Sequence, residues 1–111
     1  MDIDVTQASG VTVVTPQGDL DMATVDEVRR TLAGLIDGGQ SRVLMDLGGV
    51  GYIDSSGMGA MVAAMKQARA LGGDVRLCAL QDDVRGIFEL TRLARAMSIH
   101  TTRQEALSSW R

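Results

Sequence analysis

The stretch GYIDSSGMGA, residues 51–60, follows the short apolar run RVLMDL, residues 42–47, and precedes a longer run with helical spacing of its apolar residues. A run that is short and almost wholly apolar is typical of a strand buried on both faces of a parallel sheet. Two serines and two glycines then stand where the next helix should begin. The stretch therefore predicts a strand, a glycine-rich loop and a helix, which is the repeating unit of an α/β domain.

The rest of the chain extends this alternation on both sides. Upstream, we expect a β-hairpin across the sequence ASG, because β-branched residues are dense on either side of it. The expected strands are 3–7, 11–16, 42–47, 74–80 and 97–101, and the expected helices are 25–36, 56–71, 84–93 and 103–110. This order predicts a single α/β domain over residues 1–111, with a mixed, mostly parallel sheet, an N-terminal antiparallel hairpin and about four helices.

Three of these helices begin with capping signals. Residues 24–27 and 102–105 each fit a capping box, in which a hydroxyl precedes an acid by three residues. Asp82 or Asp83 is expected to cap the helix at residues 84–93, because a short carboxylate can accept a hydrogen bond from an N–H group of the first helical turn.

The composition excludes several classes of protein. Hydrophobic residues make up 45% of the chain and charged residues 23%, which argues against disorder. A net charge of −3 disfavours a basic face for nucleic acid. No apolar run has the length of a membrane span and no signal-peptide pattern is present, so we expect a cytoplasmic protein. The single cysteine, Cys78, reads as a small buried hydrophobe, and without a Cys/His cluster we expect no metal and no cofactor.

Two loops are expected to meet near the serines. In open α/β sheets, functional loops gather beyond the carboxyl ends of the parallel strands. Residues 18–23, GDLDMA, follow one such strand, and residues 48–57, GGVGYIDSSG, follow another. Since the first loop carries Asp19 and Asp21 and the second carries Asp54, we expect an acidic surface there.

The serines themselves, Ser55 and Ser56, admit several interpretations. A serine before a helix is a common N-cap, and capping alone is the simplest explanation of both. A helix N-terminus also has free N–H groups and partial positive charge, so it can hold a phosphate. Gly57 and Gly59 would suit a place where another group comes close to the backbone. A nucleophilic serine needs a base, and the only histidine, His100, is on the last short strand, so we expect no enzymatic activity.

Residues 43–80 resemble the core of the STAS domain of bacterial anti-sigma factor antagonists. Residues 18–32 resemble the first loop and helix of that family, and residues 84–93 resemble its third helix. The most specific piece is D-S-S-G-x-G at 54–59, directly after the apolar strand. The similarity thus spans nearly the whole chain in the right order. The four residues 48–51, GGVG, make an unusually glycine-rich approach to this motif, which is expected to loosen the loop.

The resemblance implies partner switching. Members of the family bind an anti-sigma factor that is also a serine/threonine kinase, and the sigma factor is thereby released. Phosphorylation of the serine after the motif's aspartate ends the binding, and a phosphatase resets it. That serine matches Ser55, with Ser56 as the second choice. The chain would act as a monomer or weak dimer, without nucleic acid or membrane.

The partner-binding residues expected at this surface come from both loops and the helix start: Asp19, Asp21, Asp54, Ser56, Gly57 and Met58. Met58 is either an exposed apolar contact or a core-facing helix residue.

Two other functions stay open from the sequence. One is a STAS scaffold or accessory subunit of a signalling or lipid-transport complex without a phosphorylation switch. The other, more distant, is a small hydrolase that uses Ser55.

Overall fold

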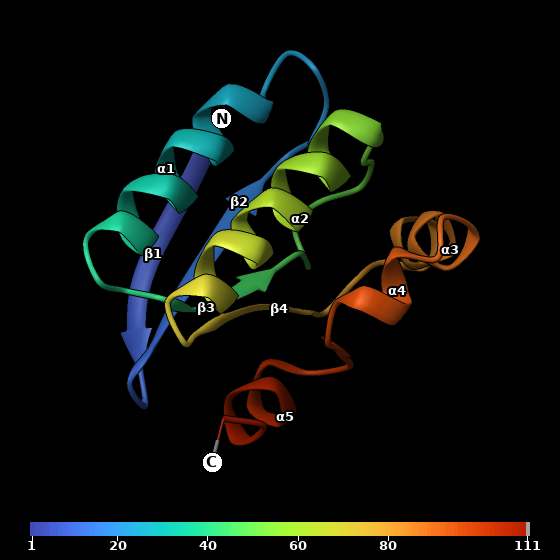
Figure 1. The fold of residues 1–111 in the computed structure, drawn as a ribbon. Coiled ribbons are helices and arrows are strands. Elements are labelled where there is room, and N and C mark those ends of the chain that lie inside the picture. The colour runs from blue at the N-terminus through green and yellow to red at the C-terminus, as the bar shows by residue number, and fades with distance from the viewer. Residues whose placement is uncertain (111) are drawn as a thin grey trace.

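A five-stranded sheet runs through the computed structural model of the chain, which describes residues 1–110 except the side chains at positions 93 and 94 (Figure 1). Its strands follow chain order: β1 (Asp2–Ala8), β2 (Val11–Gln17), β3 (Arg42–Asp46), β4 (Asp74–Cys78) and β5 (Ile99–His100). β1 pairs antiparallel with β2, and the remaining neighbours pair parallel. The predicted fold class, an α/β domain with a mixed, mostly parallel sheet, is confirmed.

The hairpin between β1 and β2 turns at the predicted place. Ser9 and Gly10 form its two-residue loop, with positive φ angles of 55° and 79°. Positive φ at both loop positions is the requirement of a type I′ turn, whose twist matches that of the paired strands. The turn therefore brings β1 back along β2 as an edge strand.

The helices within the described residues are α1 (Val25–Asp37), α2 (Ser55–Ala70), α3 (Asp82–Leu90), α4 (Leu93–Ala96) and α5 (Arg103–Ser108). Four of them stand at the predicted places. The helix predicted to reach residue 93 ends earlier, because Arg92 adopts a positive φ of 62°, which a continuing right-handed helix does not allow. The single turn α4 follows this break. None of the described helices is long and apolar enough to cross a membrane.

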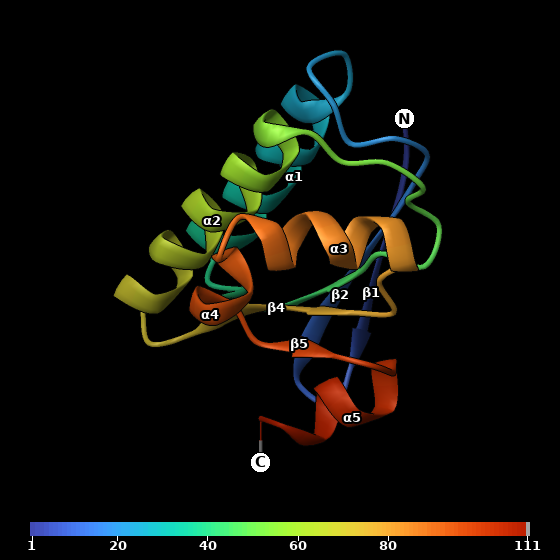
Figure 2. The same cartoon turned by 90° about the vertical axis from the view of Figure 1, so that its right-hand side faces the viewer.

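Different helices cover the two faces of the sheet, with α1 and α2 on one side and α5 on the other (Figure 2). The larger core lies under α1, α2 and α3, and its strand residues are Val14, Val43, Met45, Val75 and Leu77. The smaller core lies under α5, and its strand residues are Val11, Val13, Leu44 and Cys78. Alternate residues of the central strands thus enter different cores, which explains why β3 is almost wholly apolar.

The capping box predicted at the start of α1 is wrong. The Thr24 hydroxyl donates to the backbone carbonyl of Asp19 at 2.7 Å and makes no cap bond to the helix. The carboxylate of Glu27 accepts from the N-terminal ammonium of Met1 at 3.2 Å instead of turning back to the helix start. Both side chains that would form the box are thus used by other contacts, one within the preceding loop and one with the chain terminus.

The cap predicted for α3 is also wrong, whereas the one for α5 is confirmed. Asp82 and Asp83 lie in the first turn of α3, and the N-cap residue is Gln81, which makes no side-chain cap bond. The Gln81 amide donates to the carbonyl of Gly48 at 2.9 Å, so it ties α3 to the loop after β3. At α5, the Thr102 side chain accepts from the backbone N–H three residues on, at 3.1 Å.

Candidate functional site

The loops after β2 and β3 are joined by a short parallel bridge between Leu20 and Ile53. The N–H of Leu20 donates to the carbonyl of Tyr52 at 2.9 Å, and the carbonyl of Leu20 accepts from the N–H of Asp54 at 3.1 Å. Leu20 and Ile53 are both buried in the larger core, so the bridge is anchored from below. The two loops therefore meet at the carboxyl edge of the sheet, as the strand order predicts.

The glycine-rich segment 48–51 is hydrogen-bonded to two neighbouring segments, and the looseness expected of its glycines stays a prediction. The carbonyl of Gly49 accepts from the N–H of Gly18 at 3.0 Å, and the carbonyl of Gly48 accepts from Gln81 at 2.9 Å. A Cβ atom at Gly49 would occupy the place of the terminal amide of Gln17, an exposed side chain that would have to move aside. The glycine here lets the Gln17 side chain lie against the backbone of the segment.

Asp54 is the N-cap of α2, and its carboxylate holds both loops. One oxygen accepts the cap bond from the N–H of Gly57 at 3.0 Å. The other oxygen accepts from the N–H of Met22, in the loop after β2, at 3.2 Å. The interpretation that Ser55 and Ser56 are helix caps is therefore wrong, because Asp54 is the residue that caps α2.

The two glycines that follow the serines have different surroundings. A Cβ atom at Gly57 would lie 2.7 Å from the carbonyl oxygen of Leu20 and 2.9 Å from the side chain of Ile53. The start of α2 can therefore pack on the bridge only with glycine at this position. A Cβ atom at Gly59 would meet nothing within 4 Å. Only Gly59 leaves room at the surface for an approaching group.

The serines lie in the first turn of α2, where Ser55 is exposed and Ser56 is half-buried. The N–H groups of a first helical turn have no partner within the helix, and the helix end carries partial positive charge. The free N–H groups and the partial positive charge would thus stabilise an anion attached at Ser55.

Met58 belongs to the core, with 6% of its surface exposed. It is therefore the core-facing helix residue of the two alternatives, and Gly57 is buried as well. In the two loops that meet before the serines, Met22 (78%) and Tyr52 (49%) are exposed apolar side chains, and neither is among the partner-binding residues expected from the sequence. Neither residue belongs to a run of apolar residues with helical or strand spacing, and this lack of periodicity is the feature of the sequence that indicates their exposure.

The acids of the first loop have unequal surroundings. Asp19 is exposed, whereas Asp21 is half-buried and its carboxylate accepts from the N–H of Ala23 at 2.9 Å. Asp21 and Asp54 therefore shape the loops as well as contributing charge.

A shallow groove of about 470 Å³ runs from Ser55 along α2, and we call it the α2 groove. Its lining residues are Ser55, Met58, Gly59, Val62, Ala63, Lys66 and Thr91. The hydroxyl of Thr91, just after α3, donates to the carbonyl of Phe88 at 3.0 Å and lies 3.8 Å from the sulfur of Met58, so the end of α3 forms one side of the groove.

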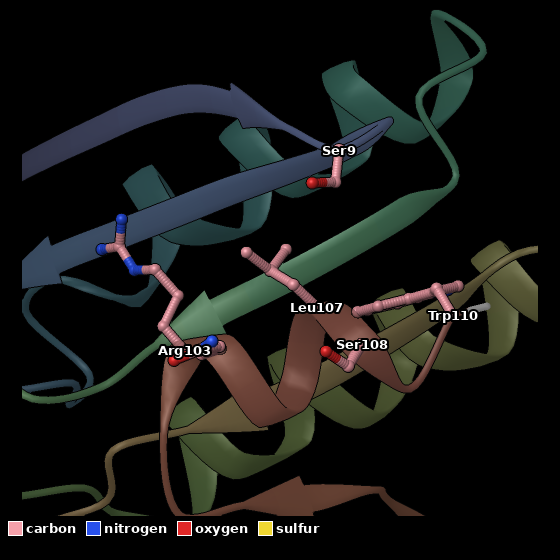
Figure 3. Close-up of a pocket in the computed structure, with 6 residues that line it drawn as sticks. Ser9, Arg103, Leu107, Ser108 and Trp110 are labelled. Carbon is pink, nitrogen blue, oxygen red and sulfur yellow. The ribbon is translucent and has the colours of Figure 1, made fainter.

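Another pocket, of about 410 Å³, lies between the hairpin turn and α5 (Figure 3). Ser9, Leu107 and Trp110 are among its lining residues. The guanidinium of Arg103 at its edge is already paired with Asp46 at 2.8 Å. This pocket contains none of the predicted site residues.

Neither Cys78 nor His100 forms a reactive centre with Ser55. Burial, above all, and the charge of Asp46 raise the pKa of the Cys78 thiol from 9.0 to about 12, against the opposing charge of Arg103. His100 pairs with Cys78 across β4 and β5, and β5 lies well away from the start of α2 (Figure 2). The geometry gives no support to a hydrolase that uses Ser55.

Sequence comparisons match this chain to known proteins over almost its full length. Residues 2–106 match the family model of the STAS domain. BtrV of Bordetella bronchiseptica, which carries the name of an anti-sigma factor antagonist, is 28% identical over 111 residues, covering 100% of this chain and 96% of BtrV. The anti-sigma F factor antagonist of Paenibacillus polymyxa is 27% identical over 109 residues, covering 97% of this chain and 93% of that protein.

Solved structures agree with this match. An anti-sigma-factor antagonist (STAS) domain protein from Planctomyces limnophilus has a TM-score of 0.85 at 26% identity, covering 98% of this chain and 97% of that chain. The Bacillus cell fate determinant SpoIIAA, in its phosphorylated form, has the same fold, with a TM-score of 0.75 at 22% identity and coverage of 99% and 100%. From the family match and the observed fold together, this chain belongs to the STAS domain family.

Proposed function

We propose that this protein is an anti-sigma factor antagonist that works by partner switching. The unphosphorylated form binds an anti-sigma factor that is also a serine kinase, and a sigma factor is released for transcription. Phosphorylation of Ser55 ends the binding, and a phosphatase restores it. On this proposal the protein is a cytoplasmic binding protein rather than an enzyme. The carrying observation is the place of Ser55, exposed at the first residue of α2 where two loops meet.

The relatives support the general role. Two of them carry the name of anti-sigma factor antagonists and match nearly the whole chain. SpoIIAA, which shares the fold, has been solved in a phosphorylated form. A STAS domain that carries an exposed serine at the start of α2 is suited to the same kind of modification.

The surroundings favour Ser55 over Ser56 as the acceptor. A kinase must bring ATP to the hydroxyl, and Ser55 is exposed whereas Ser56 is half-buried. The phosphate would add about −1.5 to −2 charge at a helix N-terminus, where the helix dipole favours it. Phosphorylation is therefore compatible with an intact fold.

The effect of the phosphate would fall on the docking surface. Exposed Met22 and Tyr52 lie in the two loops beside Ser55 and offer apolar contacts to a partner. Asp19 and Asp54 already contribute negative charge there, and a phosphate would add charge that docking must desolvate. A thousandfold loss of affinity requires only about 4 kcal/mol.

Phosphotransfer tests the proposal directly. Serine kinases of the anti-sigma type from the native cell are incubated with ATP and the parent, Ser55→Ala or Ser56→Ala protein, and the modified residue is mapped by mass spectrometry. We expect phosphate on Ser55 in the parent and in Ser56→Ala, and none in Ser55→Ala. Modification of Ser56 alone would contradict the assignment. If no kinase modifies the chain, a STAS scaffold or accessory subunit without phosphorylation becomes the better function.

A further inference from the structure

The α2 groove has an apolar floor and an open mouth. Met58 is buried and Val62 is half-buried beneath it, while Gly59 and Ala63 are exposed along it. Because a Cβ atom at Gly59 would meet nothing within 4 Å, none of the side chains that the structure describes fills the groove at that point. Leu90, the last residue of α3, is 87% exposed next to the lining residue Thr91. The groove thus offers apolar surface that a partner can cover.

The walls of the groove determine which kind of segment it accepts. They belong to α2 and to the residue that follows α3, so they offer no sheet edge to which a strand could add. Ser55 and Lys66 stand eleven positions apart on one helix, which corresponds to about 16 Å. An amphipathic helix of about three turns has the matching length and can place its apolar side chains along the floor.

Charge selects the occupant further. Lys66 is the only lysine in the chain and is exposed. Among the residues that the structure describes, it is the one charged residue that lines the groove. It forms none of the ion pairs found among the described residues. An acidic side chain on the docked segment would therefore find its counter-charge at this end of the groove.

We propose that the α2 groove receives an amphipathic helix of the kinase partner, with an acidic side chain of that helix on Lys66. This inference rests on the proposed function of Ser55, which lines the same groove. A phosphate on Ser55 puts negative charge and bound water at the near end of the groove. The docked helix must then displace that water, so phosphorylation of Ser55 weakens the contact between the helix and the α2 groove.

Paired variants of α2 test the groove. Ala63 and Ala70 are both exposed on α2, but only Ala63 lines the groove. Titration calorimetry with the kinase that modifies Ser55, without ATP, should show that Ala63→Glu weakens binding about tenfold or more. Ala70→Glu, the matched control, should bind like the parent. Lys66→Glu should also bind more weakly, with a smaller dependence on salt, and it keeps the test valid if Ala63→Glu does not fold.

The single lysine also permits a footprint. An amine-reactive acylating reagent can modify Lys66 and the α-amino group of Met1. Binding of the kinase should protect Lys66. It should leave the reactivity of Met1 unchanged, since that ammonium is paired with Glu27 at 3.2 Å, away from the groove residues.

The outcomes separate this inference from the function on which it rests. If the kinase phosphorylates Ser55 but Lys66 stays reactive and Ala63→Glu binds like Ala70→Glu, the groove assignment is wrong and the proposed function stands. If no kinase modifies Ser55, both fail. If sedimentation without partner shows a dimer that Ala63→Glu dissociates, the occupant is a second copy and the assignment to the kinase is overturned.

Discussion

The carboxylate of Asp54 accepts a hydrogen bond from the N–H of Met22 at 3.2 Å, while its other oxygen caps α2 through Gly57. One side chain therefore fixes both the start of the helix that carries Ser55 and the loop that exposes Met22. The acid next to the proposed phosphorylation site is thus part of the framework that holds the site in place.

Replacement of Asp54 should lower the stability of the domain. Asp54→Ala removes the cap bond and the bond to Met22, and we expect the free energy of unfolding to fall by about 2 kcal/mol. Asp54→Asn keeps one acceptor oxygen and should lose about half as much. Urea denaturation measures both values. Equal stability of the alanine variant and the parent would contradict the assignment of Asp54 as the anchor of both loops.

The two glycines after the serines should respond in opposite directions. Gly57→Ala places a methyl group 2.7 Å from the Leu20 carbonyl oxygen and should destabilise the domain by about 1–3 kcal/mol. Gly59→Ala meets open space within the helix and should stabilise it by up to about 1 kcal/mol. Thermal unfolding of the two variants side by side checks this, and a stabilising effect of Gly57→Ala would mean that α2 does not pack on the bridge as described.

Much of the fold follows from local patterns. The apolar run at residues 42–47 predicts a buried strand, and β3 occupies Arg42–Asp46 with its residues divided between two cores. The hairpin turn at Ser9 and Gly10 also follows from local composition. These features depend on residues close together in the chain, so the sequence is sufficient to predict them.

The errors arise where side chains find partners that the local pattern does not indicate. Thr24 and Glu27 have the spacing of a capping box, but Asp19 and the N-terminal ammonium compete for their side chains. Exposure of Met22 likewise depends on the course of two loops rather than on neighbouring residues. The motif is sufficient to predict that the serines lie in the first turn of α2, whereas the exposure of the side chains around them follows only from the fold.

Ser55→Ala should leave the fold almost unchanged. Since Asp54 supplies the helix cap, removal of an exposed hydroxyl should change the free energy of unfolding by no more than about 0.5 kcal/mol. Circular dichroism and urea denaturation measure this. A loss as large as that of Asp54→Ala would show a structural role for the serine.

Cys78 should make the domain less stable in alkaline solution. The folded state raises the thiol pKa from 9.0 to about 12, so the unfolded chain loses its proton first as the pH rises. The contribution of the thiol is therefore complete below about pH 9 and declines above it, by about 1 kcal/mol at pH 10. Urea denaturation of the reduced protein between pH 8 and pH 10 should show a flatter decline for Cys78→Ala. Parallel curves for parent and variant would show that the thiol does not contribute.

Charge at position 55 should control binding without altering the fold. Ser55→Ala cannot be phosphorylated, so it should hold the kinase partner persistently in the presence of ATP, while the parent dissociates as it is modified. Ser55→Asp adds one charge and two acceptor oxygens, fewer than a phosphate provides, so it should bind more weakly than Ser55→Ala but more tightly than the phosphorylated protein.

Asp21→Asn is the matched probe of the other loop, because the amide can keep the turn bond to Ala23 while the charge is removed. If Asp21 faces a basic group on the partner, this variant should associate more slowly and show a smaller dependence on salt. Titration calorimetry and stopped-flow association at two salt concentrations measure these effects. Equal affinities for Ser55→Ala and Ser55→Asp would mean that charge at the start of α2 does not govern the interaction, and a scaffold role without switching would then explain the domain better.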